Sequence, residues 1–119
     1  MRQVFFCFVV LFALLAGTNY SGGQQSPGRR IEIHAKRFSF EPAEITLKRN
    51  ETVTLSLTSD DVPHSLLVPD LNINGAMTKG HVTEVTVTPD KVGDFHGRCG
   101  RFCGSGHGSM TFTVHVTDK

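Results

Sequence analysis

Residues 53–58 of this chain read VTLSLT, and this stretch decides the expected fold class. Val53, Leu55 and Leu57 alternate with threonine and serine, so every second side chain is apolar. Because successive side chains of a β-strand point to opposite faces, this alternation predicts a strand with one buried face. The same period of two recurs at residues 31–35, 45–47, 85–87 and 112–116.

Turn-forming residues separate these alternating runs, as at Arg49-Asn50-Glu51 and Pro89-Asp90. No window of the sequence shows a sustained helical period. Several short strands separated by turns are typical of a sandwich or barrel with antiparallel pairing. A chain of 119 residues has room for one such domain. We therefore predict a single all-β domain.

The N-terminal residues are predicted to be an export signal. Arg2 precedes an unbroken apolar run at residues 4–16, and small and polar residues follow it. A membrane-spanning helix needs roughly 20 apolar residues, whereas a shorter run suits the core of a signal peptide. The predicted parts are a signal peptide over residues 1–22, with an uncertain cleavage bond, a flexible lead-in over 23–30 and the folded domain over 31–119. We expect export to the periplasm or another extracytoplasmic space, with membrane attachment only if the leader stays as an anchor.

A second stretch carries the chemistry, since residues 99–110 read CGRFCGSGHGSM. It holds four side chains that bind soft metal ions, namely Cys99, Cys103, His107 and Met110. Thiolate and thioether ligands select copper(I), and imidazole suits copper in both oxidation states. The glycines between them let the backbone turn tightly. His64, at the head of the apolar run 66–68, is the expected contributor from a separate segment.

Other interpretations of this stretch remain open from the residues alone. Two cysteines in an exported protein usually pair, so a Cys99–Cys103 disulfide is one alternative. A disulfide gives no role to His107 and Met110 at their fixed short offsets. A zinc site would leave the methionine idle, because zinc prefers cysteine, histidine and carboxylate ligands. The whole set favours copper.

The motifs resemble a known family. Cys99, Cys103, His107 and Met110 reproduce the Cys-x3-Cys-x3-His-x2-Met loop of dinuclear CuA domains, which occur in cytochrome c oxidase subunit II and nitrous oxide reductase. Residues 61–65, DVPHS, followed by VPDL, also resemble the oxidase subunit. The resemblance implies a cupredoxin fold, a Greek-key β-sandwich. It also implies two copper ions bridged by both sulfurs. His64 and His107 would be terminal ligands, and Met110 and the backbone carbonyl of Arg101 would be weak ligands.

The implied function is electron transfer, either as a soluble carrier or as a copper domain like that of oxidase subunit II. The implied partner is a redox protein such as a cytochrome or a terminal oxidase. Protein ligands would fill every coordination position, and a catalytic metal usually keeps one open. We therefore expect a carrier that is not an enzyme on its own, possible as the electron-entry domain of an oxidase. Two alternatives stay open: a copper storage or delivery protein, and a mononuclear blue-copper protein that uses His64, Cys103, His107 and Met110.

The charges of the chain and its departures from the family pattern limit the kind of partner to be expected. Twelve basic and eleven acidic residues, without a basic block, exclude nucleic-acid binding. Arg98 and Arg101 make the copper end basic, whereas the oxidase domain offers carboxylates. We expect these arginines to attract an acidic partner. They either lower the pKa of the thiols or are simply solvated charges of the loop. Leu66 replaces the tryptophan of the oxidase pattern, and residues 74–80 replace an oxidase loop only loosely. His34 and His115 fall on the polar side of their strands and are expected to face solvent.

Overall fold

The alternating runs form β-strands in the structure, a computed structural model that describes residues 28–118. The strands are β1 (Arg29–Lys36), β2 (Ser39–Glu41), β3 (Glu44–Lys48), β4 (Val53–Ser59), β5 (His64–Val68), β6 (Ile73–Met77), β7 (Thr83–Val87), β8 (Gly93–Cys99) and β9 (Thr111–Thr117). Two short 3-10 turns, η1 (Pro69–Leu71) and η2 (His107–Ser109), are the only helical segments among the described residues. Neither could span a membrane. The predicted leader and most of the lead-in lie outside the described residues.

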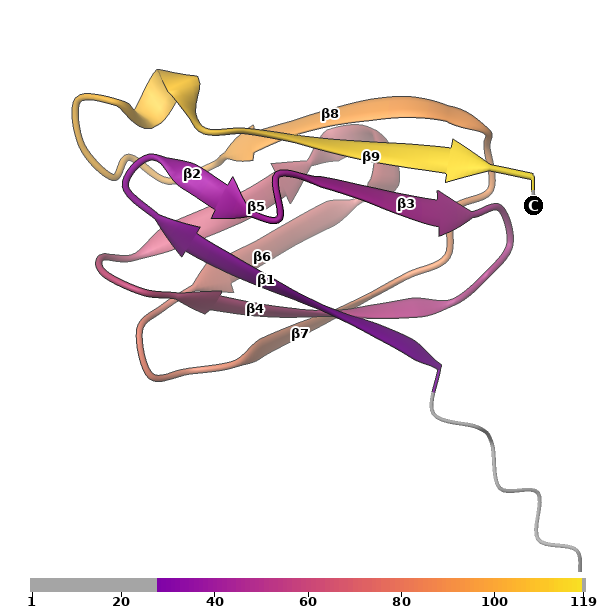
Figure 1. The fold of residues 1–119 in the computed structure, drawn as a ribbon, viewed down its shortest axis with the longest axis horizontal. Coiled ribbons are helices and arrows are strands. Elements are labelled where there is room, and N and C mark those ends of the chain that lie inside the picture. Colours follow the sequence, from indigo (N-terminus) through magenta and orange to yellow (C-terminus); the bar gives the residue numbers. More distant parts are fainter. Residues whose placement is uncertain (1–27, 119) are drawn as a thin grey trace, which may run out of the picture.

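The strands form two sheets that pack face to face, as Figure 1 shows. One has the order β2-β1-β4-β7 and the other β3-β9-β8-β5-β6, so the predicted all-β sandwich is confirmed. The expected antiparallel pairing holds for most neighbouring strands, whereas β1 pairs with β4 and β3 with β9 in parallel. Between β1 and β4 the chain crosses to the opposite sheet to form β3, and it then returns in the direction of β1. This crossover is what makes a parallel neighbour possible.

The core lies between the inner faces of the two sheets. Its fully buried aliphatic side chains come from strands of both sheets, including Ile33, Leu47, Leu55, Leu57, Leu66, Val68 and Val114. Phe40 and Phe112 meet edge to face, with ring centroids 5.7 Å apart and planes at 71°. Burial of each such side chain stabilises the fold by about 1.5–3 kcal/mol. The packed core therefore fixes the strand ends that carry the loops.

Three of the connections at one end of the sandwich are the β1–β2 turn, the β4–β5 loop and the β8–β9 loop (Figure 1). The last of these spans residues 100–110. β8 stays paired with β9 as far as Arg98 and continues to Cys99, so the loop begins only after that residue. The backbone N–H of Cys99 donates to the carbonyl of Met110 at 3.1 Å. This bond closes the loop at its base, just before β9 begins at Thr111.

Candidate metal centre

His64 is held in one orientation at the start of β5. Its side chain is buried, with 1% of the residue exposed. Nε2 lies 2.8 Å from Oδ1 of Asp61, so this nitrogen carries the hydrogen and donates a hydrogen bond to the carboxylate. The other nitrogen, Nδ1, is then free to accept or to ligate, and it faces Sγ of Cys99 at 3.9 Å. A carboxylate behind a ligating histidine is the arrangement that sets its tautomer in metal sites.

Asp61 joins the β4–β5 loop to the β1–β2 turn. Besides the bond from His64, its carboxylate accepts the backbone N–H of Arg37 at 2.8 Å and that of Val62 at 2.6 Å. Partial burial alone would raise the pKa of Asp61. The bonds from Arg37, His64 and Val62 outweigh that effect and hold the pKa well below its usual range. Asp61 therefore stays ionised, and its interactions connect two of those three loops.

The two cysteines bring the remaining predicted ligands together. Their Sγ atoms are 3.7 Å apart, and both thiols are free and buried. Sγ of Cys99 lies 3.0 Å from the carbonyl oxygen of Arg101. Sγ of Cys103 lies 3.7 Å from Nδ1 of His107 and 3.5 Å from Sδ of Met110. Each residue proposed as a ligand from the sequence thus places its donor atom within 4 Å of one of the two sulfurs.

The donor set fits copper. The ligand atoms of His64, Cys99 and Cys103 lie within 4.8 Å of one another, and they form the one such group of histidine, cysteine and carboxylate residues in the described chain. Two thiols, two imidazoles and a buried thioether are soft and borderline donors, which select copper over hard cations. Met110 is fully buried beside Cys103, so a zinc site would leave it without a role.

The pKa of the Cys103 thiol differs from the sequence expectation. Burial, the neighbouring Cys99 thiol and the charge of Asp61 raise the pKa of Cys103 to about 11. The arginine whose charge opposes this rise is Arg37, not Arg98 or Arg101. Arg98 lies on the exposed face of β8 and does not line the site. The expectation that Arg98 and Arg101 lower the thiol pKa was therefore wrong for Cys103, and metal must displace its proton on binding.

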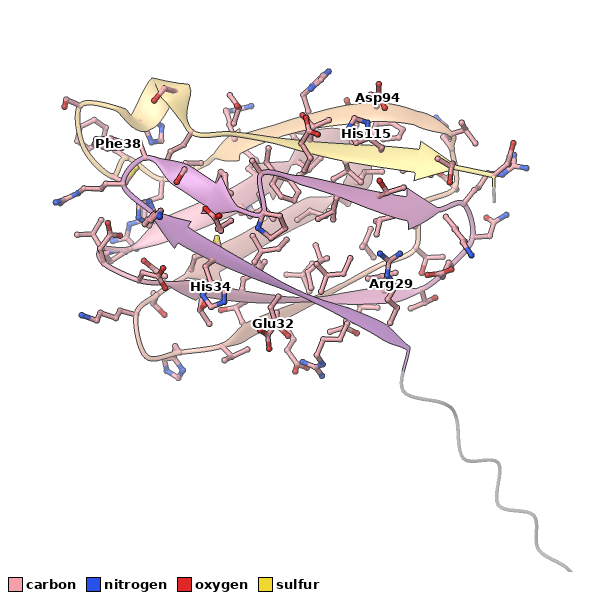
Figure 2. All side chains as sticks on the ribbon, viewed as in Figure 1. Arg29, Glu32, His34, Phe38, Asp94 and His115 are labelled. Carbon is pink, nitrogen blue, oxygen red and sulfur yellow. The ribbon has the colours of Figure 1, made fainter. Side chains whose placement is uncertain are left out.

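Phe38, which sequence reasoning missed, supports the ligand loop from the β1–β2 turn (Figure 2). A Cβ added to Gly106 would lie 2.3 Å from Cδ2 of the Phe38 ring. Only glycine allows the loop to approach the ring this closely. Gly106 then leads into η2, where the backbone N–H of His107 donates to the carbonyl of Gly104 at 3.1 Å. No signal in the sequence paired Phe38 with this loop, because Phe38 and Gly106 are 68 positions apart in the chain.

The other histidines do not join the centre. His34, His81, His96 and His115 are exposed or half-exposed, and none belongs to the buried group of ligand atoms. The prediction that His34 and His115 face solvent is confirmed. Both do have acidic partners, however. Nδ1 of His115 lies 2.6 Å from Asp94, and Nε2 lies 3.5 Å from Glu44.

The chain belongs to the cupredoxin-like domain family, whose sequence model matches residues 5–112. It is 31% identical, over 76% of its length, to the probable cytochrome c oxidase subunit 2 of Rickettsia prowazekii, and it covers 29% of that protein. It is 30% identical to the cytochrome c oxidase subunit 2 of Thermus thermophilus over 74% of its own length and 65% of that protein. The chain thus spans between about a quarter and two thirds of these relatives.

A solved structure has the same fold. It is the periplasmic domain of subunit II of cytochrome oxidase (CoxB) from Bradyrhizobium japonicum, with a TM-score of 0.71 and 18% identity. The likeness covers 76% of this chain and 85% of that one. Fold, sequence relatives and donor set agree. The chain is a cupredoxin domain that resembles the copper domain of cytochrome c oxidase subunit II and carries candidate copper ligands at His64, Cys99 and Cys103.

Proposed function

We propose that this chain is an electron-transfer protein with a dinuclear copper centre of the CuA type. The ligands would be His64, Cys99, Cys103, His107, Met110 and the backbone carbonyl of Arg101. One observation carries the proposal: two buried, unpaired thiols lie 3.7 Å apart, and each has further donor atoms beside it. A mononuclear site needs only one of them. When bound, copper would supply one-electron oxidation and reduction.

The contribution of the chain is to keep the donors still. Cys99 ends a strand of the five-stranded sheet, and His64 begins another strand of the same sheet. The ligand loop, residues 100–110, is closed at its base by the hydrogen bond between Cys99 and Met110 and is supported by Phe38. Donors that cannot move keep the same geometry in both oxidation states, and preorganised surroundings lower the cost of charge transfer. This rigidity supports a carrier.

The proposed role is that of a carrier and not an enzyme on its own, and it could be the electron-entry domain of an oxidase. His64, Cys99, Cys103 and Met110 are buried, which supports a centre whose coordination positions are filled by the protein. A catalytic metal usually keeps an open position. The relatives named above are oxidase subunits, which supports a redox partner such as a cytochrome or a terminal oxidase. The likeness of this chain to a periplasmic domain supports an extracytoplasmic location.

Copper reconstitution tests the centre. We expect two copper ions per chain and an optical and paramagnetic spectrum of one electron shared between two nuclei. One copper per chain, with a spectrum from a single nucleus, would overturn the dinuclear assignment in favour of a blue-copper site. Rapid loss of copper to a modest chelator would favour storage or delivery. Steady oxygen consumption with a simple reductant would contradict the carrier role.

The leader is tested separately. We expect the mature protein to begin near residue 23, because the apolar run suits a cleaved signal peptide. Mass analysis of the N-terminus of protein recovered from cells is the measurement. Retention of Arg2 in a membrane fraction would show that the leader serves as an anchor instead.

A further inference from the structure

A hollow opens on one of the two sulfur ligands. It has a volume of about 260 Å³ and is lined by Arg37, Val62, Pro63, Arg101, Phe102, Cys103 and Gly104. Cys103 belongs to its wall, whereas Cys99 does not. The hollow therefore gives an approaching molecule access to one of the proposed copper ligands, Cys103.

An exposed aromatic ring stands at this hollow. Phe102 is 76% exposed, the highest value among the large apolar side chains that the structure describes as exposed. It is bonded directly to Cys103 in the chain, and its ring centroid is 5.7 Å from that of His107. Val62 and Pro63 extend the apolar lining beside it. Apolar surface rimmed by polar groups is typical of interaction sites, and aromatic residues are enriched in them.

Two arginines at the rim have no carboxylate partner among residues 28–118. Arg29, Arg30 and Arg49, at other places on the surface, form ion pairs with Glu51, Glu84 and Asp118. Arg37 and Arg101 form none. The nearby carboxylate of Asp61 is already engaged by backbone N–H groups and His64.

The Arg37 side chain is held at the rim. Its Nε donates to the carbonyl of Cys103 at 3.2 Å, which places the guanidinium over the ligand loop. Arg101 is exposed on that loop. The rim therefore carries two cations with unmet pairing capacity, around an exposed ring and directly over a ligand.

We propose that this hollow is the docking and electron-entry surface for a redox protein that presents carboxylates around an exposed apolar edge. The inference rests on the proposed function. The partner's carboxylates pair with Arg37 and Arg101, and its apolar edge packs on Phe102. With copper bound, the centre would accept one electron from the partner on the Cys103 side, so the partner would be oxidised by one electron and the centre reduced by one. No bond forms or breaks, and no proton moves.

Binding is tested with two forms of one probe: native cytochrome c, whose surface is rich in lysine, and the same protein after succinylation, which turns its lysines into carboxylates. Isotope-labelled chain without copper is titrated with each form at low ionic strength. We expect tighter binding of the succinylated form, with shifted amide signals at residues 37, 62 and 101–104. The double variant Arg37→Gln/Arg101→Gln should bind about three- to tenfold more weakly, as for two exposed ion pairs.

A matched control separates this site from overall charge. The variant Arg29→Gln/Arg49→Gln removes the same charge elsewhere on the surface and should bind the succinylated form like the wild type, whereas the charge-conserving Arg37→Lys/Arg101→Lys variant should retain binding. Tighter binding of native cytochrome c, shifts that lie on another face, or equal losses in both charge-removing variants would overturn the proposal. So would displacement of the probe by millimolar inorganic phosphate at constant ionic strength, because the hollow would then be a small-anion site.

Electron transfer is measured next on copper-loaded protein with reduced succinylated cytochrome c. We expect the rate to fall with rising salt, because exposed charges are screened within about 8 Å at physiological ionic strength. We also expect a lower rate in the Arg37→Gln/Arg101→Gln variant, which lacks the two cations, and in Phe102→Ser, which lacks the exposed ring. Rates that none of these changes affects would overturn the entry role. If the chain binds no copper pair but still binds the probe at these residues, the docking surface stands and the proposed function fails.

Discussion

Two histidines of this protein are each hydrogen-bonded to an aspartate, but they differ in burial and in their other neighbours. His64 lies 2.8 Å from Asp61, and His115 lies 2.6 Å from Asp94. The His64 side chain is fully buried, whereas that of His115 is 36% exposed. The imidazole–carboxylate pair is therefore shared by a candidate metal ligand and by a surface residue. The pair alone does not define a metal site.

Strand position explains the difference. His64 begins β5 with its side chain toward the core, where two sulfurs lie. His115 lies on β9, whose inward positions are Phe112, Val114 and Val116, so it points outward next to Asp94 on β8 (Figure 2). Its two nitrogens face two carboxylates and no sulfur. Burial and soft neighbours, set by which face of a sheet a residue occupies, are what separate the two sites.

The largest expected effect on the buried site comes from removing one of the two sulfurs near His64. We expect Cys99→Ser to reduce copper from two ions per chain to one, because His64, Cys103, His107 and Met110 remain. Cys103→Ser should be more damaging, since its sulfur lies beside Cys99, His107 and Met110 at once. Metal counting and the optical spectrum are the measurements. An unchanged spectrum in both variants would show that the ligand assignment is wrong.

Asp61→Asn tests the aspartate of the buried pair. Without the charge, the hydrogen bond that orients His64 is weaker, and we expect copper affinity to fall about 10- to 100-fold. Asp94→Asn, the matched change beside His115, should leave copper affinity unchanged. Competition with a copper chelator measures both. Equal affinities in the two variants would mean that Asp61 does not position His64.

Gly106→Ala tests the support beneath the ligand loop. The new methyl group would meet the Phe38 ring, so we expect the free energy of unfolding to fall by about 1–3 kcal/mol, as for other overpacked sites. Gly108→Ala is the control, because a Cβ there has no atom within 4 Å. It should change stability by less than about 0.5 kcal/mol. Denaturant unfolding of both variants is the measurement, and equal losses would show that the loop does not rest on Phe38.

The smallest effect concerns the exposed pair. The hydrogen bond to Asp94, and more weakly Glu44, raises the pKa of His115 above its ordinary value of 6.5. A raised folded-state pKa means that the pair's contribution to stability is complete below that ordinary value and is lost as pH rises through the folded value. Titration of the ring protons by NMR should show the raised pKa, and Asp94→Asn should lower it. A wild-type pKa at or below 6.5 would contradict the prediction.

Much of the fold could be predicted from local patterns. The alternation at residues 53–57 and 112–116 predicted β4 and β9 because one face of each strand is buried. The alternation did not predict β8, because Gly97 interrupts its apolar face. A Cβ at Gly97 would lie 2.6 Å from Val68 and 2.8 Å from the carbonyl of Leu67, so the close contact with β5 requires glycine. The residue that hides the strand in the sequence is the one that lets it pack.

The sequence pattern did not predict β6 for a similar reason. Residues 74–80 stand where the related oxidases have a loop, yet residues 73–77 pair with β5 across the whole of that strand. Asn74 and Gly75 have weak strand propensity on their own. The pairing arises from the register with β5, which begins with His64 opposite Met77. A contact between strands decided this element, and local preference did not.

By itself the sequence determined the chemistry of this protein. The spacing of Cys99, Cys103, His107 and Met110 within one glycine-rich stretch, together with a distant His64, was sufficient to predict a copper centre, because ligand type and offset are local properties. Only the tertiary structure decided that Asp61 orients His64, that Phe38 supports the loop, and that Arg37, not Arg98, lies with Arg101 over Cys103. These contacts join residues of different loops, and which loops meet depends on the packing of the two sheets.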